Sequence, residues 1–244
     1  MTAGDGTEPS ERRSAREAAH PAGRLAERRR LRRLRPERRW PMAVAVVACM
    51  VLHLLLPPQL RLGSAWILAG LVIVLLVALI VGDPGRIDRR KPWLGIVTGV
   101  MIGMITAINT WSALRLVDGI LHANTFPDPD DLLLYGGIVW ITNAAAFALW
   151  YWDLDGGGSA QRFHGSGPTP SFIFPEMEYP EYVGEGWYPR FIDYLTFSFA
   201  TAMAFSPTDV SAIKPWAKVL CLVESIVSLA LAALVIARAI NILQ

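Results

Sequence analysis

The chain has 244 residues, of which 53% are hydrophobic and 18% are charged, and its mean hydropathy is +0.36. A soluble domain of this length carries more charge and shorter apolar runs, so this composition excludes an ordinary soluble domain and indicates an integral membrane protein. The formal net charge of +2 combines a net +6 in residues 1–40, which hold twelve Arg and six acidic residues, with a net −4 in the rest.

Residues 1–39 are rich in Arg, Glu, Ala, Gly and Pro and contain few bulky apolar residues. This composition predicts a basic, largely disordered tail, with a basic helix across residues 22–34. By the positive-inside rule the tail holds the N-terminus in the cytoplasm of a multi-pass cell-membrane protein. A surface for anionic lipid is the alternative role of the tail; we expect no nucleic-acid partner.

Residues 40–152 contain four apolar runs, each approaching the length that crosses about 30 Å of hydrocarbon. The basic loop RIDRRKPW follows the second run, and the loop at residues 122–131 contains acidic residues and no Lys or Arg. Both loops agree with a cytoplasmic N-terminus. The predicted spans are Trp40–Leu56, Leu62–Val81, Trp93–Leu121 and Leu132–Trp152.

Small residues recur at every fourth position of the third span, which gives one smooth helix face. In a membrane such a face lets another helix approach closely. The partner helix is either in the same chain or in another, as a homo-oligomer or a different membrane protein. The four positions are Gly95, Gly99, Gly103 and Ala107.

Ionisable and polar side chains at membrane depth are costly and therefore indicate either function or helix pinning. Glu224, about two turns into the last span, is the main one, and we predict hydrogen bonds to it from three polar side chains. The favoured interpretation is a helix-pinning network, and the sharper one is a carboxylate that binds a proton or cation. Arg115 and Asp118, spaced i, i+3, predict a structural ion pair. The predicted partners of Glu224 are Asn109, Asn143 and Thr201.

The fourth span ends in Trp150-Tyr151-Trp152, which we interpret as an interfacial aromatic anchor. Residues 153–190 then form a long loop, dense in Gly and Pro, with a net charge of −4. Its segment FIFPEMEYPEY is too apolar for a free linker, so we expect it to lie against the rest of the protein. Loops of this length are often functional.

The chain shows no sequence pattern of a known catalytic or cofactor-binding site. Cys49 and Cys221 both lie in apolar runs and are predicted to be core residues. The four His residues have no metal-ligand spacing, and no nucleophile, phosphate-binding or dinucleotide motif is present. We therefore predict no enzyme, no metal site and no cofactor.

Residues 191–244 have the layout of a pore module: a short helix over 191–205, a polar elbow at Ser206-Pro207-Thr208-Asp209, and a long last span. The predicted fold is an all-α polytopic membrane protein of about six hydrophobic helices, the fifth short and broken. A short fifth crossing, with both termini inside, is favoured. A segment that re-enters from the inner side is the alternative.

The words FALWYW, FPEM and AFSPTD, within a match from about Trp40 to Gln244, resemble a bacterial family of uncharacterised integral membrane proteins. This resemblance implies class and location, and no activity. A second, more limited resemblance covers about Tyr194–Asn241, which is similar to the pore helix, filter and inner helix of potassium channels.

The filter positions depart from the potassium-channel pattern. Selectivity there needs successive backbone carbonyls pointing at the ion, which two glycines make possible. This chain has Ser206 and Thr208 at those positions and Pro207 in place of tyrosine. We therefore predict possible ion flux without potassium selectivity, and alternatively a non-conducting scaffold or partner-binding protein. The elbow candidates are Thr201, Met203, Ala204, Phe205, Ser206, Pro207, Thr208 and Asp209.

Overall fold

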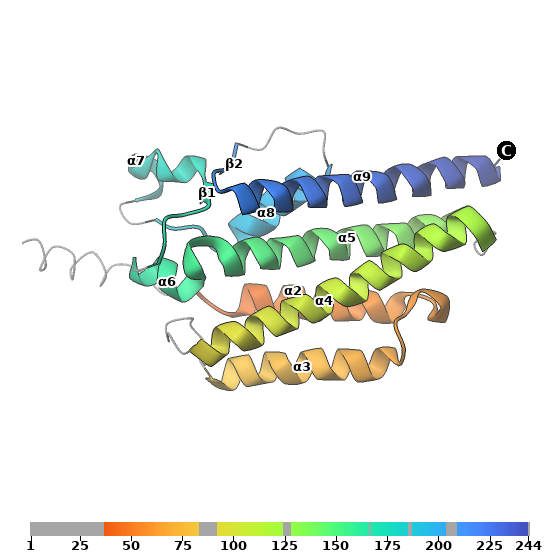
Figure 1. Cartoon of the computed structure of the whole chain (residues 1–244), viewed down its shortest axis with the longest axis horizontal. Helices are drawn as coiled ribbons and strands as arrows, with labels where there is room; N and C mark the ends of the chain where they lie inside the picture. Colours follow the sequence, from red (N-terminus) through yellow and green to blue (C-terminus); the bar gives the residue numbers. More distant parts are fainter. Residues whose placement is uncertain are drawn as a thin grey trace, which may run out of the picture.

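The computed structural model describes residues 37–82, 92–123, 128–165, 167–184, 187–203 and 209–243. Five long helices lie side by side and form an elongated bundle (Figure 1). This confirms the predicted all-α class. The five helices are α2 (Trp40–Leu55), α3 (Ala65–Gly82), α4 (Pro92–Asp118), α5 (Pro129–Leu154) and α9 (Pro215–Leu243).

Three helical stretches in the described parts of the chain are long and apolar enough to cross a membrane, and two shorter apolar helices accompany them. The composition and these helices together make the chain a membrane protein. The shorter helices are α2 and α3. The three long stretches are Trp93–His122, Pro129–His164 and Pro215–Ile242.

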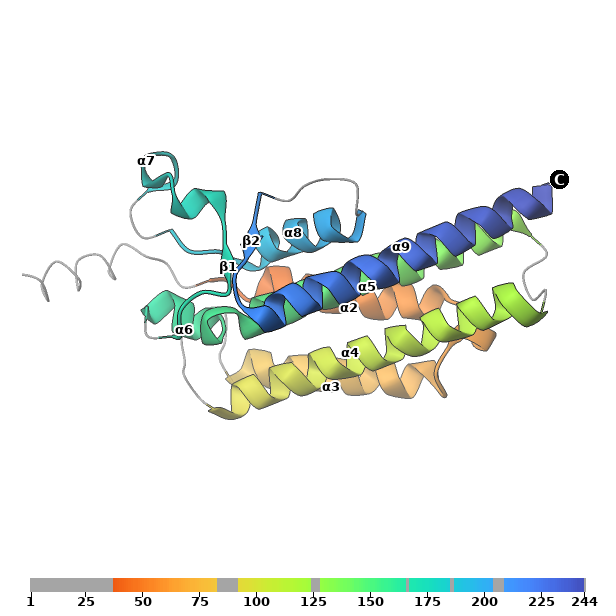
Figure 2. The same ribbon diagram turned by 45° about the horizontal axis from the view of Figure 1, so that its top comes forward.

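Successive long helices run in alternating directions, as Figures 1 and 2 show. We call the end at which α2 begins the proximal end and the opposite end the distal end. From the proximal end α2 and α4 run outward, α3 and α5 return, and α9 runs outward again. The chain therefore ends at the distal end, opposite Trp40.

Local sequence accounts for the helix boundaries. In α2, Pro41 is in the first turn, where its missing N–H costs nothing, and the helix ends just before Pro57-Pro58. In α5, Pro129 and two acidic residues occupy the first turn, where negative charge suits the helix dipole. After Leu154 the chain turns at Gly156, whose φ of +57° lies in the left-handed region, a backbone conformation that favours glycine.

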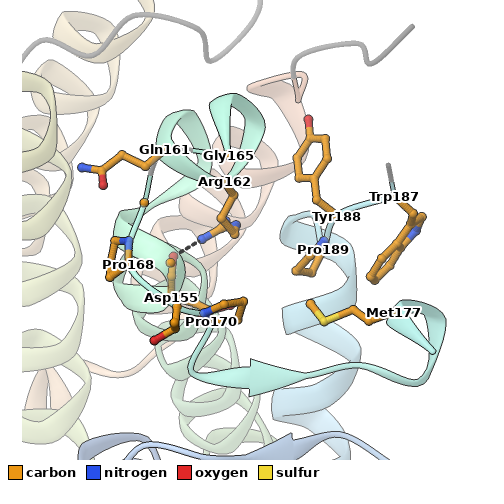
Figure 3. A pocket seen from close by; sticks show the side chains of 13 residues that line it. Asp155, Gln161, Arg162, Gly165, Pro168, Pro170, Met177, Trp187, Tyr188 and Pro189 are labelled. Carbon is orange, nitrogen blue, oxygen red and sulfur yellow. Dashed lines mark hydrogen bonds between the residues drawn. The ribbon is translucent and has the colours of Figure 1, made fainter. Parts of the chain in front are cut away.

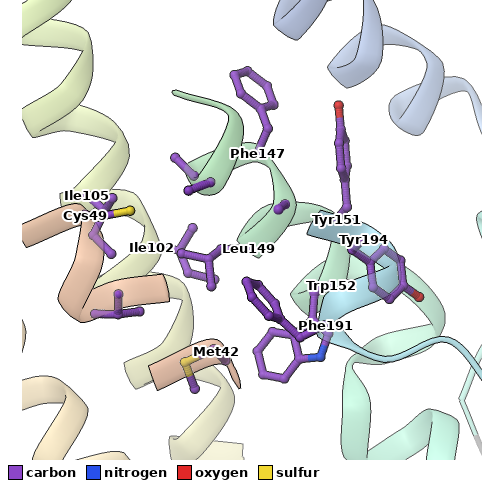
Figure 4. Close-up of a cluster of buried hydrophobic side chains, with 14 of the residues drawn as sticks. Met42, Cys49, Ile102, Ile105, Phe147, Leu149, Tyr151, Trp152, Phe191 and Tyr194 are labelled. Carbon is purple, nitrogen blue, oxygen red and sulfur yellow. The ribbon is translucent and has the colours of Figure 1, made fainter. Parts of the chain in front are cut away.

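The main core lies where α5 meets α2, α4 and α8 (Phe191–Met203). In Figure 4, Met42 of α2 and Ile102 of α4 approach Leu149 and Trp152 of α5, with Phe191 beside them. Cys49 is also buried in this core, and both cysteines are free thiols. The predicted core role of Cys49 is therefore confirmed.

The described part of residues 153–190, predicted to be a long loop whose apolar segment lies against the protein, contains short helices and a strand at the proximal end. The strand β1 (Phe172–Ile173) pairs antiparallel with β2 (Ser211–Ala212) through Phe172 opposite Ala212. Phe172 and Phe174 are buried, as expected for the apolar segment. Its helices are α6 (Ser159–His164) and α7 (Pro180–Val183), with 3-10 turns η3 (Asp155–Gly157) and η4 (Pro175–Met177).

The short helix α8 has 13 residues and begins at the proximal end, where Phe191 N donates to Glu37. It runs inward beside α9, and Ser225 Oγ of α9 donates to the carbonyl of Thr201, 3.3 Å away. The next described element, β2, lies at the proximal end again, beside β1 (Figure 2). Both α8 and β2 therefore begin at the proximal end; a short fifth crossing and a re-entrant segment both stay predictions.

α8 is shorter than a full membrane crossing. Thirteen helical residues rise about 20 Å, which is less than the hydrocarbon thickness of about 30 Å. The described residues thus form five long helices and the half-length α8, besides the short α6 and α7 of the proximal layer.

Candidate functional site

Glu224 of α9 is fully buried, at 0% exposure, and joins three helices. Its Oε2 accepts a hydrogen bond from Tyr151 Oη of α5 at 2.5 Å, and its Oε1 contacts Ser198 Oγ of α8. Ser198 Oγ also lies 2.6 Å from the carbonyl oxygen of Ala144 in α5. The carboxyl group therefore lies at the junction that holds the half-length helix in place.

One hydroxyl group at this junction contacts two acceptors. Ser198 Oγ has one hydrogen and lies against both the carbonyl oxygen of Ala144 and the carboxyl of Glu224. Ser198 of α8 therefore contacts both α5 and α9.

Asn109, Asn143 and Thr201, predicted to bond Glu224, have other surroundings. Asn143 Nδ2 donates to Ser228 Oγ at 3.1 Å, one helical turn further along α9. Thr201 Oγ1 donates to the carbonyl of Phe197 in its own helix, at 2.9 Å. Asn109 is buried in α4. The predicted hydrogen-bond donors to Glu224 are therefore wrong, because its hydrogen bonds come from Tyr151 and Ser198. The prediction that Glu224 itself is buried among the helices is correct.

The aromatic triplet at the end of α5 is a structural hub and not an interfacial anchor. Tyr151 and Trp152 are buried, with exposures of 0% and 3%. Trp150 Nε1 donates to Thr106 Oγ1 of α4 at 2.9 Å. The interfacial interpretation is wrong because each polar atom of the triplet has a partner inside the protein.

Glu37 was assigned to a disordered tail but is a second buried carboxylate, 3% exposed. It accepts hydrogen bonds from Trp152 Nε1 at 3.0 Å, Ser159 Oγ at 2.6 Å and Phe191 N at 2.6 Å. One carboxylate thus fixes the end of α5, the start of α6 and the start of α8. The nearby Arg39 is also buried, while the predicted basic helix at 22–34 lies outside the described residues.

Asp155 is the third buried carboxylate. Its Oδ1 accepts from Ser171 N at 2.5 Å and its Oδ2 from Tyr194 Oη at 2.6 Å. Arg162 Nη1 donates to two carbonyls at the end of α5, those of Trp152 at 2.7 Å and Asp155 at 2.5 Å. The guanidinium also lies over the Tyr194 ring, 5.0 Å from its centroid. This arrangement caps α5 and connects it to α8.

A cavity of about 390 Å³ opens beside this cap, between α6, the 167–170 segment and the 187–189 segment (Figure 3). It is within the range of small-ligand sites. Burial, and then the charge of Glu37, raise the pKa of Tyr188 in its wall, so this phenol stays protonated at neutral pH. The lining residues include Asp155, Gln161, Arg162, Met177, Trp187 and Tyr188.

Most of the predicted elbow lies outside the described residues, including Ala204, Phe205, Ser206, Pro207 and Thr208. The two flanking positions are described. Met203 at the end of α8 is half exposed and Asp209 is exposed.

The small-residue stripe on α4 is open in this chain. A Cβ atom added at Gly95, Gly99 or Gly103 meets no atom within 4 Å, and Ala107 is exposed. Gly136 of α5 is the opposite case, because a Cβ there lies 2.7 Å from Val235 of α9. Close packing inside the chain therefore uses a glycine that was not singled out.

The predicted ion pair is present at the distal end. Arg115 Nη1 lies 3.5 Å from Asp118, whose other oxygen is 3.3 Å from His122 Nδ1. All three side chains are substantially exposed, so the contribution to stability is small.

No family model, curated protein or solved structure matches this chain. The candidate site therefore rests on the geometry of its own residues.

Proposed function

We propose that this membrane protein supports ion flux through the module formed by α8, residues 204–209 and α9, without potassium selectivity. The observation that carries the proposal is the half-length α8, which begins at the proximal end, contacts Glu224 through Ser198 and is followed by β2 at the same end. A helix that only anchored the chain in the membrane would span it at full length.

The protonatable junction supports the same proposal. Glu224 connects α9 to α8 through the hydrogen bond that it accepts from Ser198 Oγ. An ionised carboxylate accepts this bond and that of Tyr151 Oη more strongly than a neutral carboxyl does, so a change in protonation of Glu224 changes the hold on α8. Proton uptake and release at Glu224 is therefore coupled to the position of the re-entrant segment. We assign protons or monovalent cations as the transported species.

The charge distribution supports one orientation. The basic sequence before Trp40 and the basic sequence between α3 and α4 both connect to the proximal end. By the positive-inside rule this end is cytoplasmic. In this orientation α8 re-enters from the cytoplasm and the C-terminus is outside.

Flux in proteoliposomes tests the proposal. Separate gradients of protons, sodium and potassium are applied to vesicles containing the full chain, and flux is followed with pH-sensitive and ion-sensitive dyes. We expect flux that is lost in Glu224→Gln and retained in Glu178→Gln, an exposed carboxylate at the proximal end. Wild-type vesicles as tight as empty ones would refute the proposal, and so would potassium-selective current. Unchanged flux in Glu224→Gln would make that residue structural.

A second candidate, a non-conducting assembly protein, is favoured by the open stripe on α4. Gly95, Gly99 and Gly103 leave a smooth face that no helix in the described chain covers. Such a face suits a second membrane helix, from another copy or another protein.

Crosslinking in membranes tests this candidate. Gly99→Leu should abolish crosslinking through α4 because a bulky side chain separates the helices. Gly70→Leu, at an equally open glycine of α3, is the matched control and should leave crosslinking unchanged. Equal crosslinking in both variants contradicts an interface at the stripe.

A further inference from the structure

We propose that the exposed face of α7, which carries Tyr179, Glu181 and Tyr182, binds the chain's own basic segment, residues 24–35. This inference goes beyond ion flux and does not depend on it. It rests on the exposure of α7, on the opposite charges of the two segments and on the end of the bundle at which both are attached.

The helix α7 is left uncovered by the rest of the described protein. It packs mainly against the 3-10 turn η4 that precedes it, and Figures 1 and 2 show it standing away from the long helices. Tyr182 is 84% exposed and Tyr179 is 50% exposed, and the centroids of their rings lie 6.3 Å apart. Tyrosine is enriched in protein interfaces, so a pair of exposed tyrosine rings suits the binding of a polypeptide.

The sequence around α7 is acidic. Between Arg162 and Arg190 it contains four glutamates and no Lys or Arg. Glu181 of α7 is exposed, and its carboxylate has no hydrogen-bond or ion-pair partner among the described residues. A carboxylate beside two aromatic rings suits a partner rich in arginine, because guanidinium groups pair with carboxylates and stack on aromatic faces.

The chain carries such a partner just before its first described residue. Residues 24–35 contain seven arginines and one glutamate, a net charge of +6. Residues 1–23 contain three arginines and four acidic residues, a net charge of −1. The positive charge before Glu37 is therefore concentrated in the basic segment next to the bundle.

Both segments are attached at the proximal end. Glu37 is fixed there by a hydrogen bond from Phe191 N at 2.6 Å. Val183, the last residue of α7, precedes Phe191 by eight residues, which span at most about 29 Å when fully extended. The basic segment spans up to about 43 Å when extended, so its arginines are able to reach the face of α7.

The attachment at Glu37 strengthens contacts that are individually weak. An exposed ion pair or an exposed cation–π contact contributes little on its own. Because the basic segment is joined to the bundle, its effective concentration near α7 is on the order of millimolar, and several weak contacts act together. Such binding depends on salt, since 0.1 M salt screens exposed charges beyond about 10 Å.

Distances between spin labels on the full chain test the proposal. The labels are attached at Ala26→Cys in the basic segment and at Thr169→Cys, an exposed position outside α7, in a chain lacking Cys49 and Cys221. Double electron–electron resonance is recorded in phosphatidylcholine nanodiscs at about 0.05 M and about 0.5 M salt. We expect one dominant distance at low salt and a broad distribution with a longer mean at high salt.

A charge reversal on α7 tests the surface itself. Glu181→Arg replaces the carboxylate with a group that repels the basic segment, so the dominant distance should be lost at low salt. Asp209→Arg is the matched control, because Asp209 is an exposed carboxylate outside α7 and the change in net charge is the same. Trypsin cleavage within residues 28–33 should be at least about twofold faster in Glu181→Arg than in Asp209→Arg.

Three results would overturn the proposal. The first is a broad distribution in the wild type at low salt. The second is a dominant distance and a cleavage rate that Glu181→Arg leaves unchanged. The third is a dominant distance that appears only in phosphatidylglycerol nanodiscs and persists in Glu181→Arg, because the basic segment then binds anionic lipid and not α7.

Discussion

The two halves of the bundle are stabilised in different ways. Around α5, α8 and α9, three buried carboxylates each accept hydrogen bonds from different elements of the chain. In α3 and the adjacent part of α4, the buried side chains are almost entirely apolar, and the hydroxyl of Thr98 bonds only within its own helix. The difference shows how each helix is positioned. Polar contacts specify the position of the half-length helix α8, and apolar packing specifies the position of full-length helices that lie side by side.

The comparison predicts that, of the substitutions considered, the one at Glu37 causes the largest loss of stability. In Glu37→Ala, three buried donors on α5, α6 and α8 lose their acceptor, at about 1–3 kcal/mol each if unsatisfied. We expect a loss of roughly 3 kcal/mol or more and a clearly lower thermal unfolding midpoint in detergent. Glu178→Ala, at an exposed carboxylate, is the control. Identical melting of the two variants would contradict the role assigned to Glu37.

A smaller effect is expected at Glu224. Tyr151→Phe removes one of the hydroxyl groups that bond the carboxyl while keeping the buried ring. The expected loss of stability is about 1–2 kcal/mol. The same change at Tyr182, which is 84% exposed, should have no effect on the unfolding midpoint. If Tyr151→Phe also leaves it unchanged, the junction does not stabilise the fold.

Substitutions at two glycines compare a tightly packed helix contact with an open helix surface. Gly136→Leu forces side-chain atoms against Val235, where even a Cβ approaches to 2.7 Å, and should destabilise by about 1–3 kcal/mol. Gly70→Leu on α3 meets no atom within 4 Å of the added Cβ and should leave stability unchanged. Thermal unfolding in detergent checks both. Equal unfolding midpoints would contradict the tight contact of α5 with α9.

The smallest effect concerns Asn143 and Ser228, which form one interhelical hydrogen bond at 3.1 Å. Such bonds contribute about 0.6 kcal/mol on average in membrane proteins. A double-mutant cycle with Asn143→Ala and Ser228→Ala should give a coupling free energy of about this size. A coupling several times larger would mean that polar contacts along the whole of α5 and α9, and not only near α8, dominate the bundle.

The sequence predicts much of the bundle because long apolar runs identify membrane helices. The boundaries of α2, α3, α4 and α5 lie within three residues of the predicted ones. Glu224 was also identified, since an ionisable residue inside an apolar run is rare.

The rest of the site depends on contacts between distant segments. Glu37 lies in a tail whose composition indicates disorder, and its partners are 115 to 154 positions away in the chain. Tyr151 and Trp152 are followed by acidic residues and glycines, a pattern shared by interfacial anchors and by helix ends covered by a folded layer. The proposed re-entry of α8 has one signal in the sequence, the shortness of this helix, which has 13 residues.

Cysteine labelling from each side of the membrane tests the central claim, that α8 re-enters and does not cross. Single cysteines are placed at Glu178, Ser211 and Asn241, all exposed, in a chain lacking Cys49 and Cys221. We predict that a membrane-impermeant maleimide labels Glu178→Cys and Ser211→Cys from the same side and Asn241→Cys from the opposite side. Labelling of Ser211→Cys and Glu178→Cys from opposite sides would show that α8 crosses the membrane and would contradict the account.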